Sequence, residues 1–455
     1  MTICAAAGEG KAGPRLSMRR GACPSLSAPM ATGDGLLVRL RPANPGLTLR
    51  ELAEIADGAE FYGNGILEIT ARGNLQIRGL TAETVPLLSA KIRETGIEIA
   101  EGLAVEVPPL AGLDPLEIAD PQPLATRLRA ASAARHPPLV LAPKLSITVD
   151  GGGSLHLGEI TADIRLRAVA GGKEPAWLLS LAGTEHTAAR IAVLGEPAVV
   201  PVVLGLLERL ATMGEGARGR DIDAGALKDQ LGSAADADDI APLASASSPC
   251  GIHRIGADRV VLGVGLAFGQ IRAGNLKAFI KALANLGATD IRLSPGHGMM
   301  VLGLHPEKIA AAQALAVGHG LRVFPDDPRN HIAACAGIGA CGSAGIDTRA
   351  VAQMMVERAP ALLDGSLTVH VSGCAKGCAR PGASPLTITA APIGYGLVVN
   401  GAASAAPNAY IEENTMEAAL ERLDALVRRR KRAGESARSC LTRLGAEVAA
   451  AVQRE

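Results

Sequence analysis

Four cysteines in the last third of the chain have a spacing that suits a metal centre. Cys335 and Cys341 have five residues between them, and Cys374 and Cys378 have three. Both pairs lie in glycine-rich segments, where the backbone can curl around a bulky inorganic group. Structural zinc prefers about two to four residues between paired cysteines, so the first gap suits zinc less well. The pattern predicts that these thiolates ligate a 4Fe–4S cluster and that the protein transfers electrons, with zinc or unliganded buried cysteines as alternatives.

An internal repeat indicates how the chain is organised around these cysteines. Residues 33–80 can be laid over residues 256–304, and each copy predicts a strand, a helix and two further strands. Thr48 and Glu51 form a capping-box signature at the start of the first helix. One copy has too little core to fold alone, so we expect the two copies to pair about a pseudo-twofold axis.

The rest of the chain alternates strands and helices, which gives an α+β fold overall. Between the copies we expect strands at 139–141, 145–149 and 163–168 and helices near 122–132 and 199–213, and after the cysteines a helix over 415–432. The predicted units are a flexible N-terminal tail (1–28), a first half-module (29–81), a first α/β domain (82–232), a linker (233–249), a second half-module (250–306), an iron–sulfur α/β domain (307–410) and a C-terminal helical segment (411–455).

Composition narrows the possible partners. The 45 basic residues balance 45 acidic residues, and only 2% of residues are aromatic, so neither nucleic acid nor an acidic membrane surface is an expected partner. No apolar run is long enough to span a membrane, and the first thirty residues lack the hydrophobic stretch of an export signal. We therefore expect a cytoplasmic protein whose eight cysteines stay reduced and available to metal.

The cysteine pattern, the repeat and the segment TARGNLQ at 70–76 together resemble the sirohaem-dependent nitrite and sulfite reductase family. The resemblance runs over most of the chain. It implies a nitrite/sulfite reductase-like fold, with two ferredoxin-like half-modules related by a pseudo-twofold axis and α/β domains of the sirohaem-reductase type. It also implies that Cys378 lies at the active cavity, because in that family the last cysteine bridges the cluster to the sirohaem iron.

Within that family, the chain is most similar to the precorrin-3B synthase branch. The similarity rests on residues 20–24, 29–39, 141–144, 149–153 and 370–378. It implies that a tetrapyrrole is the substrate rather than a prosthetic group. It also implies oxygen-dependent hydroxylation of precorrin-3A at C20, with closure of a γ-lactone, in aerobic cobalamin biosynthesis.

Departures from the reductase pattern favour this branch. Where the reductases have two lysines, this chain keeps Lys144 and has Ser146, and residues 105–116 contain no basic residue. Reduction of nitrite or sulfite needs concentrated positive charge at the iron, and about half of that charge is missing. A sirohaem-dependent nitrite or sulfite reductase remains the alternative function.

A precorrin has a ring of carboxylates, so its site needs scattered cationic donors. Arginine suits this task because its fork binds a carboxylate through two hydrogen bonds. Our candidate substrate-binding residues are Arg72 and Lys144, with Asn74 and Gln76 as neutral donors. His297 is either a further carboxylate contact or a turn residue.

The resemblance further implies a mononuclear non-haem iron and NADH as the formal reductant. The nine histidines offer no adjacent pair for a facial triad, so no iron ligand or catalytic residue is assigned. His331 and His370 flank the cysteine loops and are expected to be structural rather than redox-active. Because no NAD-binding domain is visible, we expect a separate reductase to deliver electrons, alongside precorrin-3A and dioxygen as partners.

Overall fold

The two copies of the repeat form two five-stranded sheets that exchange an edge strand. The computed structural model describes residues 24–171, 174–232 and 237–453. The first sheet runs β1 (Met30–Thr32), β2 (Gly35–Leu40), β5 (Leu75–Leu80), β4 (Ile66–Ile69) and β13 (Gln270–Arg272), and the second runs β11 (Gly251–Arg254), β12 (Val260–Gly265), β15 (Gly298–Val301), β14 (Asp290–Ser294) and β3 (Leu47–Thr48). The predicted pseudo-twofold pairing is confirmed, since β13 of the second copy completes the first sheet and β3 of the first copy completes the second.

The exchanged strands β3 and β13 were not expected from the sequence. They have two and three residues, which is too short for any alternation to be visible. Only their partners in the other copy give them hydrogen bonds. The sequence could therefore predict that the copies pair but not how.

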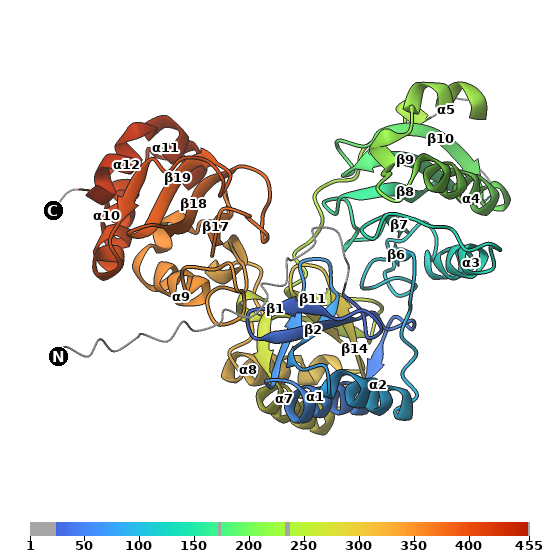
Figure 1. Cartoon of the computed structure of the whole chain (residues 1–455), viewed down its shortest axis with the longest axis horizontal. Coiled ribbons are helices and arrows are strands. Elements are labelled where there is room, and N and C mark those ends of the chain that lie inside the picture. The colour runs from blue at the N-terminus through green and yellow to red at the C-terminus, as the bar shows by residue number, and fades with distance from the viewer. Residues whose placement is uncertain (1–23, 172–173, 233–236, 454–455) are drawn as a thin grey trace, which may run out of the picture.

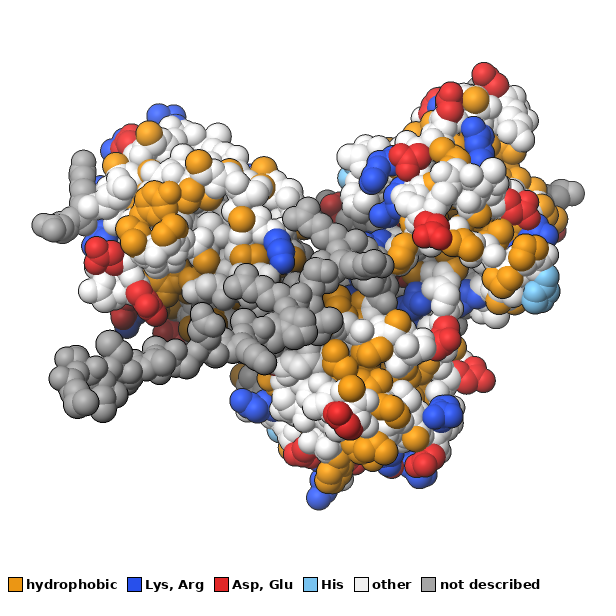
Figure 2. Space-filling view, in the orientation of Figure 1, with side chains coloured by type: hydrophobic (Ala, Val, Ile, Leu, Met, Phe, Trp, Pro, Cys, Tyr) orange, Lys and Arg blue, Asp and Glu red, His pale blue; other side chains and the backbone are white. Residues whose placement is uncertain are grey.

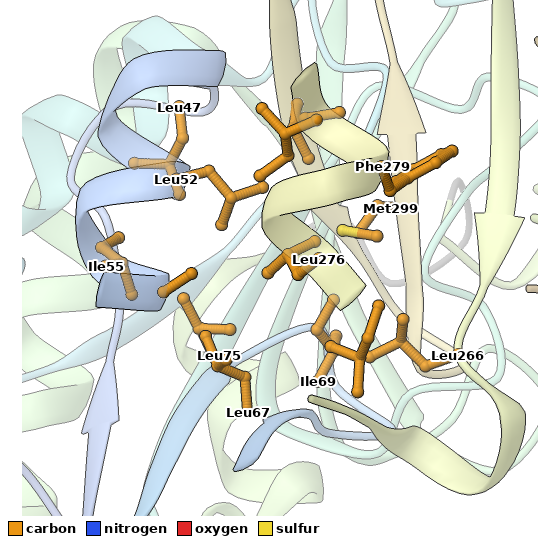
Figure 3. Close-up of a cluster of buried hydrophobic side chains, with 14 of the residues drawn as sticks. Leu47, Leu52, Ile55, Leu67, Ile69, Leu75, Leu266, Leu276, Phe279 and Met299 are labelled. Atoms are coloured by element: carbon orange, nitrogen blue, oxygen red, sulfur yellow. The ribbon is translucent and has the colours of Figure 1, made fainter. Parts of the chain in front are cut away.

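Four helices cover one side of the two sheets: α1 (Leu49–Tyr62), α2 (Thr84–Glu94), α7 (Ala273–Asn285) and α8 (Ile309–Gly318) (Figure 1). The predicted capping box is present, with Thr48 Oγ1 accepting from Glu51 N at 3.2 Å and Glu51 Oε2 accepting from Thr48 N at 2.7 Å. Leucines and isoleucines of α1 meet α7 and the strands in one apolar core (Figure 3). Because strand residues alternate between faces, the opposite face of the first sheet carries polar residues, among them Arg39, Glu68 and Gln76.

The middle domain is a five-stranded sheet in the order β10-β9-β8-β7-β6. Its elements are β6 (Ala104–Glu106), α3 (Gln122–Ala133), β7 (Ser146–Asp150), β8 (Ala162–Val169), β9 (Ala176–Gly183), β10 (Ala189–Gly195), α4 (Glu196–Met213) and α5 (Ala224–Leu231). Both predicted helices and two predicted strands are found there. The strand predicted at 139–141 is wrong: that segment has no ladder partner, Val140 is 57% exposed, and nearby prolines lack the N–H a strand needs.

The cysteine-bearing domain has the sheet order β16-β17-β18-β19-β20. Its elements are β16 (Ile332–Ala334), α9 (Thr348–Arg358), β17 (Val369–Ser372), β18 (Ser384–Ala391), β19 (Gly394–Gly401), β20 (Ala409–Ile411), α10 (Met416–Arg430), α11 (Ala437–Leu444) and α12 (Ala446–Gln453). The three C-terminal helices share one apolar core with this sheet. By contrast, α8 packs into the core of the half-modules, so the boundary predicted at residue 307 falls too early.

The paired half-modules, the middle domain and the cysteine-bearing domain form three lobes (Figure 1). Basic and acidic side chains are interspersed over the visible face of all three, in keeping with the net charge of zero (Figure 2). Most of the predicted N-terminal tail, residues 1–23, lies outside the described residues, as do residues 233–236 of the predicted linker. None of the helices in the described ranges is long and apolar enough to cross a membrane.

Candidate functional site

The four cysteines lie on two loops at the same edge of one sheet. Strands β16 and β17 run parallel, so their carboxyl ends meet; Cys335 follows β16 directly, and Cys374 follows β17 after Gly373. Cys341 and Cys378 lie further along the same two loops. Partial desolvation raises the pKa of Cys378 although its side chain reaches the surface, and the other three thiols raise it further because they stand close enough to repel a second negative charge. The structure therefore places all four predicted ligands on two neighbouring loops.

The donor set and its cradle suit an iron–sulfur cluster. Gly373 N donates to Cys335 Sγ at 3.1 Å, the kind of contact that tunes a cluster. Gly337 has a φ of +74°, and a Cβ there would lie 2.6 Å from Thr348 Oγ1, so only glycine fits this bend. Within the described ranges, no three His, Cys, Asp or Glu side chains converge closely enough to hold a single metal ion. No ligand set for a mononuclear iron is formed in that part of the chain.

The first cysteine loop packs directly on the first half-module. A Cβ on Gly33 would lie 2.4 Å from Gly342 N and 2.7 Å from the carbonyl carbon of Cys341, so the two backbones touch. Beside this contact, the Arg78 side chain donates to the carbonyl oxygen of Ala340. Arg78 is 3% exposed and pairs with Asp34 at 2.8 Å and Glu68 at 3.1 Å. The half-module therefore supports the loop that carries Cys341.

The three histidines singled out from the sequence lie in different settings. His370 on β17 is fully buried, and burial lowers its pKa to about 4, so the ring is neutral; neither ring nitrogen has a partner among the described residues. Burial also lowers the pKa of His331. His297 lies in the turn between β14 and β15, where its Nδ1 is 2.6 Å from the carbonyl oxygen of Ile69. His297 is not among the residues that line the cavity described next.

A cavity of about 540 Å³ is lined by residues of the first half-module and the middle domain. Its wall holds the basic residues Arg39, Arg41, Arg72, Lys144 and Arg218 and the acidic residues Glu101 and Glu106. Its volume falls within the range typical of small-molecule sites. None of the four cysteines lines it, and Cys378 is exposed, so the predicted place of Cys378 at the cavity is not seen. The excess of basic side chains makes the wall suitable for an anionic molecule.

Three of the four predicted substrate residues meet on this wall. Arg72 and Asn74 come from the β4–β5 turn, and Lys144 precedes β7. Arg72 is already engaged: its Nε donates to Glu106 Oε1 at 2.9 Å, its Nη2 contacts the other carboxylate oxygen, and its Nη1 donates to the carbonyl oxygen of Thr161 at 2.8 Å. In the described part of the chain, no side chain pairs with the ammonium group of Lys144. Lys144 is therefore the more available cation.

Gln76 lies elsewhere than predicted. It is 7% exposed on β5, inside the sheet rather than on the cavity wall. With its amide oriented to suit both neighbours, its oxygen accepts from Arg39 Nε at 3.1 Å and Arg39 Nη2 at 2.8 Å, and its nitrogen donates to Glu68 Oε2 at 3.0 Å. Its direct contact with substrate is thus not supported, and it acts on the cavity only through Arg39.

Three cations of the wall were missed by the sequence analysis. Arg39 and Arg41 flank the buried Leu40 at the end of β2, so alternation alone could have placed them on the face opposite the core. Arg218 follows α4, and its guanidinium is held by the buried carboxylate of Asp163 at 2.8 and 2.9 Å. No local pattern connects Arg218 with the other residues of the wall, of which the nearest along the chain is Thr161, so only the tertiary structure shows it.

The chain was compared with family models, with solved structures and with the sequences of known proteins. The family described as the nitrite/sulfite reductase ferredoxin-like half domain matches residues 28–95. The structure is similar to that of the NirA protein of Mycobacterium tuberculosis, with a TM-score of 0.67 and 18% identity over 91% of this chain and 84% of that one, which shows a shared fold.

Sequence comparison is more specific than the fold. The sulfite reductase (NADPH) hemoprotein beta-component of Myxococcus xanthus is 28% identical over 38% of this chain and 34% of its own length. A precorrin-3B synthase of Sinorhizobium sp is 55% identical over 100% of this chain and 99% of its own length. The resemblance to the precorrin-3B synthase branch is confirmed, and the chain belongs to the precorrin-3B synthase family.

Proposed function

We propose that this chain catalyses the oxygen-dependent conversion of precorrin-3A to precorrin-3B, by hydroxylation at C20 and closure of a γ-lactone. The observation that carries the proposal is the 55% identity over the whole chain to a protein named precorrin-3B synthase. The cavity supports it, because a precorrin has many carboxylates and the wall offers five basic side chains against two acidic ones.

Within the cavity we assign different tasks to the basic residues. Lys144 and Arg41 are placed to bind substrate carboxylates. No described side chain pairs with Lys144, and Arg41 Nη2 donates to the carbonyl oxygen of Gly102 at 2.8 Å, which leaves its other donors for a ligand. Asn74 adds a neutral donor on the same wall. Arg72 can bind a substrate carboxylate only if it gives up its ion pair with Glu106. We therefore expect its main task to be holding the wall in place, and substrate binding to be secondary.

The four cysteines Cys335, Cys341, Cys374 and Cys378 would hold the 4Fe–4S cluster, which supplies electrons when bound. The reaction must place one oxygen atom on C20 and release the other as water, which takes two electrons and two protons. We propose NADH as their formal source, delivered by a separate reductase. The described residues form no mononuclear metal site, so no step is assigned to a second iron.

Oxygen incorporation tests the function. Protein whose cluster has been assembled without air is mixed with precorrin-3A, a reductant and isotopically labelled dioxygen. The product should be lactonised and heavier by one labelled oxygen atom. Absence of label in the product, with an intact cluster, would refute the proposal.

The alternative function, a sirohaem nitrite or sulfite reductase, is favoured by the half-domain match over residues 28–95 and by the partial matches to sulfite reductases. A reductase would contain sirohaem in an amount equal to the chain and show its strong Soret-type absorption. We expect the loaded protein to show only the broad absorption of an iron–sulfur cluster.

A further inference from the structure

A row of polar side chains crosses the first half-module on the face opposite its core. Arg39, Gln76, Glu68 and Gln270 stand directly opposite one another on the neighbouring strands β2, β5, β4 and β13. Each contacts the next: Gln76 accepts from Arg39 and donates to Glu68, and Gln270 Nε2 donates to Glu68 Oε1. The row thus joins four strands, of which the last belongs to the second copy of the repeat.

The chemistry of the row allows only one arrangement. A guanidinium can only donate hydrogen bonds and a carboxylate can only accept them, so the Gln76 amide between Arg39 and Glu68 must turn its oxygen to the former and its nitrogen to the latter. Glu68 is a charged acceptor with a side chain only 13% exposed, which makes these contacts strong. Glu68 therefore fixes the orientation of Gln76, and Gln76 fixes that of Arg39.

The two ends of the row reach different places. At one end, Arg39 lines the cavity. At the other end, Gln270 Oε1 accepts from the guanidinium of Arg349, which lies in the first turn of α9, directly after the first cysteine loop. Glu68 also accepts from Arg78 Nη1 at 3.1 Å, and Arg78 holds the carbonyl oxygen next to Cys341. Glu68 is thus in contact with every branch.

We propose that Glu68 is a positioning residue with two arms: through Gln76 it sets the orientation of Arg39 in the cavity, and through Gln270 and Arg78 it seats the loop that carries Cys341. The cavity arm rests on the proposed function, since it takes Arg39 to contact a tetrapyrrole carboxylate. The loop arm rests only on the contacts with Ala340 and Arg349.

Three variants separate the arms. Gln76→Leu cuts the cavity arm, Gln270→Leu cuts the loop arm at Arg349, and Glu68→Gln weakens both. Two quantities are measured on anaerobic, cluster-loaded protein: the Kd for precorrin-3A by absorbance titration, and the electron paramagnetic resonance spectrum and midpoint potential of the reduced cluster. Glu83→Gln, at an exposed glutamate directly before α2, is the matched control and should change neither.

We expect Gln76→Leu to raise the Kd about tenfold, the loss that follows when a charged group loses its hydrogen-bonded support, and to leave the cluster spectrum unchanged. Gln270→Leu should alter the spectrum and midpoint potential and keep the Kd within about twofold. Glu68→Gln should change both quantities. If Glu68→Gln does not fold, Gln76→Leu and Gln270→Leu still show whether the two arms act separately or whether each substitution simply disorders the whole half-module.

Wild-type Kd and spectrum in Glu68→Gln would overturn the inference while leaving the proposed function intact. Equal changes of both quantities in Gln76→Leu and Gln270→Leu would also overturn it, since that is the effect of general loosening. A wild-type protein that does not bind precorrin-3A would instead overturn the proposed function and the cavity arm with it. The spectrum of Gln270→Leu would then still test the loop arm.

Discussion

The carboxylate of Asp163 in the middle domain binds Arg218 of the cavity wall, and its removal should destabilise that domain strongly. Asp163 lies on β8, and its side chain is 5% exposed. It accepts four hydrogen bonds: from Arg218 Nε (2.8 Å) and Nη2 (2.9 Å), Ser146 N (3.0 Å) and Gly219 N (2.9 Å). The change Asp163→Ala leaves all four donors without their acceptor.

The size of the loss follows from burial. Removing one partner of a buried ion pair costs about 3–5 kcal/mol, because the other charge is left uncompensated. Arg218 is 26% exposed, so water can partly replace the carboxylate, and we take the lower limit of about 3 kcal/mol. With a denaturant dependence of about 2 kcal/mol per molar urea, the midpoint of unfolding should fall by about 1.5 M.

The only tryptophan of the chain makes this domain easy to follow. Trp177 is fully buried on β9, in the same sheet as Asp163, so its fluorescence reports the unfolding of the middle domain rather than of the other lobes. Urea titrations of wild type and Asp163→Ala, read by this fluorescence, give the two midpoints. Because Arg218 lines the cavity, the same variant should also bind precorrin-3A more weakly in dilute buffer.

A matched control separates the ion pair from a general effect of losing an aspartate. Asp229 is exposed on α5 of the same domain, and Asp229→Ala should shift the midpoint by less than about 0.3 M. If Asp163→Ala shifted the midpoint no more than this control does, the four hydrogen bonds would contribute little net stability. The reasoning from burial would then be refuted.

Three further predictions concern the cavity, the pH dependence and the cysteine loop. Lys144→Met should raise the Kd for precorrin-3A about tenfold, measured by anaerobic titration, and an unchanged Kd would remove Lys144 from the site. Burial raises the pKa of Glu117 from 4.5 to about 7. Between these two pH values the folded protein keeps the proton on Glu117, whereas the unfolded chain has lost it. The contribution of Glu117 to stability is therefore present below pH 4.5 and lost as the pH rises to about 7. In Glu117→Gln, the urea midpoint, read by tryptophan fluorescence, should depend less on pH over that range than in the wild type. An unchanged dependence of the midpoint on pH would contradict this. Gly33→Ala should lower the iron bound per chain because its Cβ would lie 2.4 Å from Gly342 N, whereas Gly216→Ala, with no atom within 4 Å, should leave the iron count unchanged.

Much of the fold was predictable because its signals are local. The capping box at Thr48 and Glu51 occupies four residues, and the helix that it starts ends where the apolar stripe ends. The strands β7 and β8 are continuous buried runs that can be recognised without their neighbours. The error at 139–141 has the same origin, since a short apolar run looks like a strand whether or not a partner lies beside it.

The candidate site was predictable in part. The spacing of the four cysteines predicted one shared centre, and the structure places both cysteine loops at the same edge of one sheet. Arg72 and Lys144 were identified by resemblance, and the structure places both on one cavity wall. Gln76 was assigned to the substrate as a neutral donor on the same strand and turn as Arg72, and only the sheet register shows that it faces Arg39 and Glu68 instead.

By itself, the sequence determined that this chain carries two copies of one half-module, a four-cysteine centre and the pattern of a tetrapyrrole-binding family. The tertiary structure decided how the copies exchange β3 and β13 and which cations share a cavity. It also decided that Glu68 stands between the cavity and the cysteine loop. The physical reason is distance along the chain: periodicity, caps and ligand spacing act within a few residues, whereas the cavity wall joins residues from Pro24 to Arg218 that meet only when the domains pack.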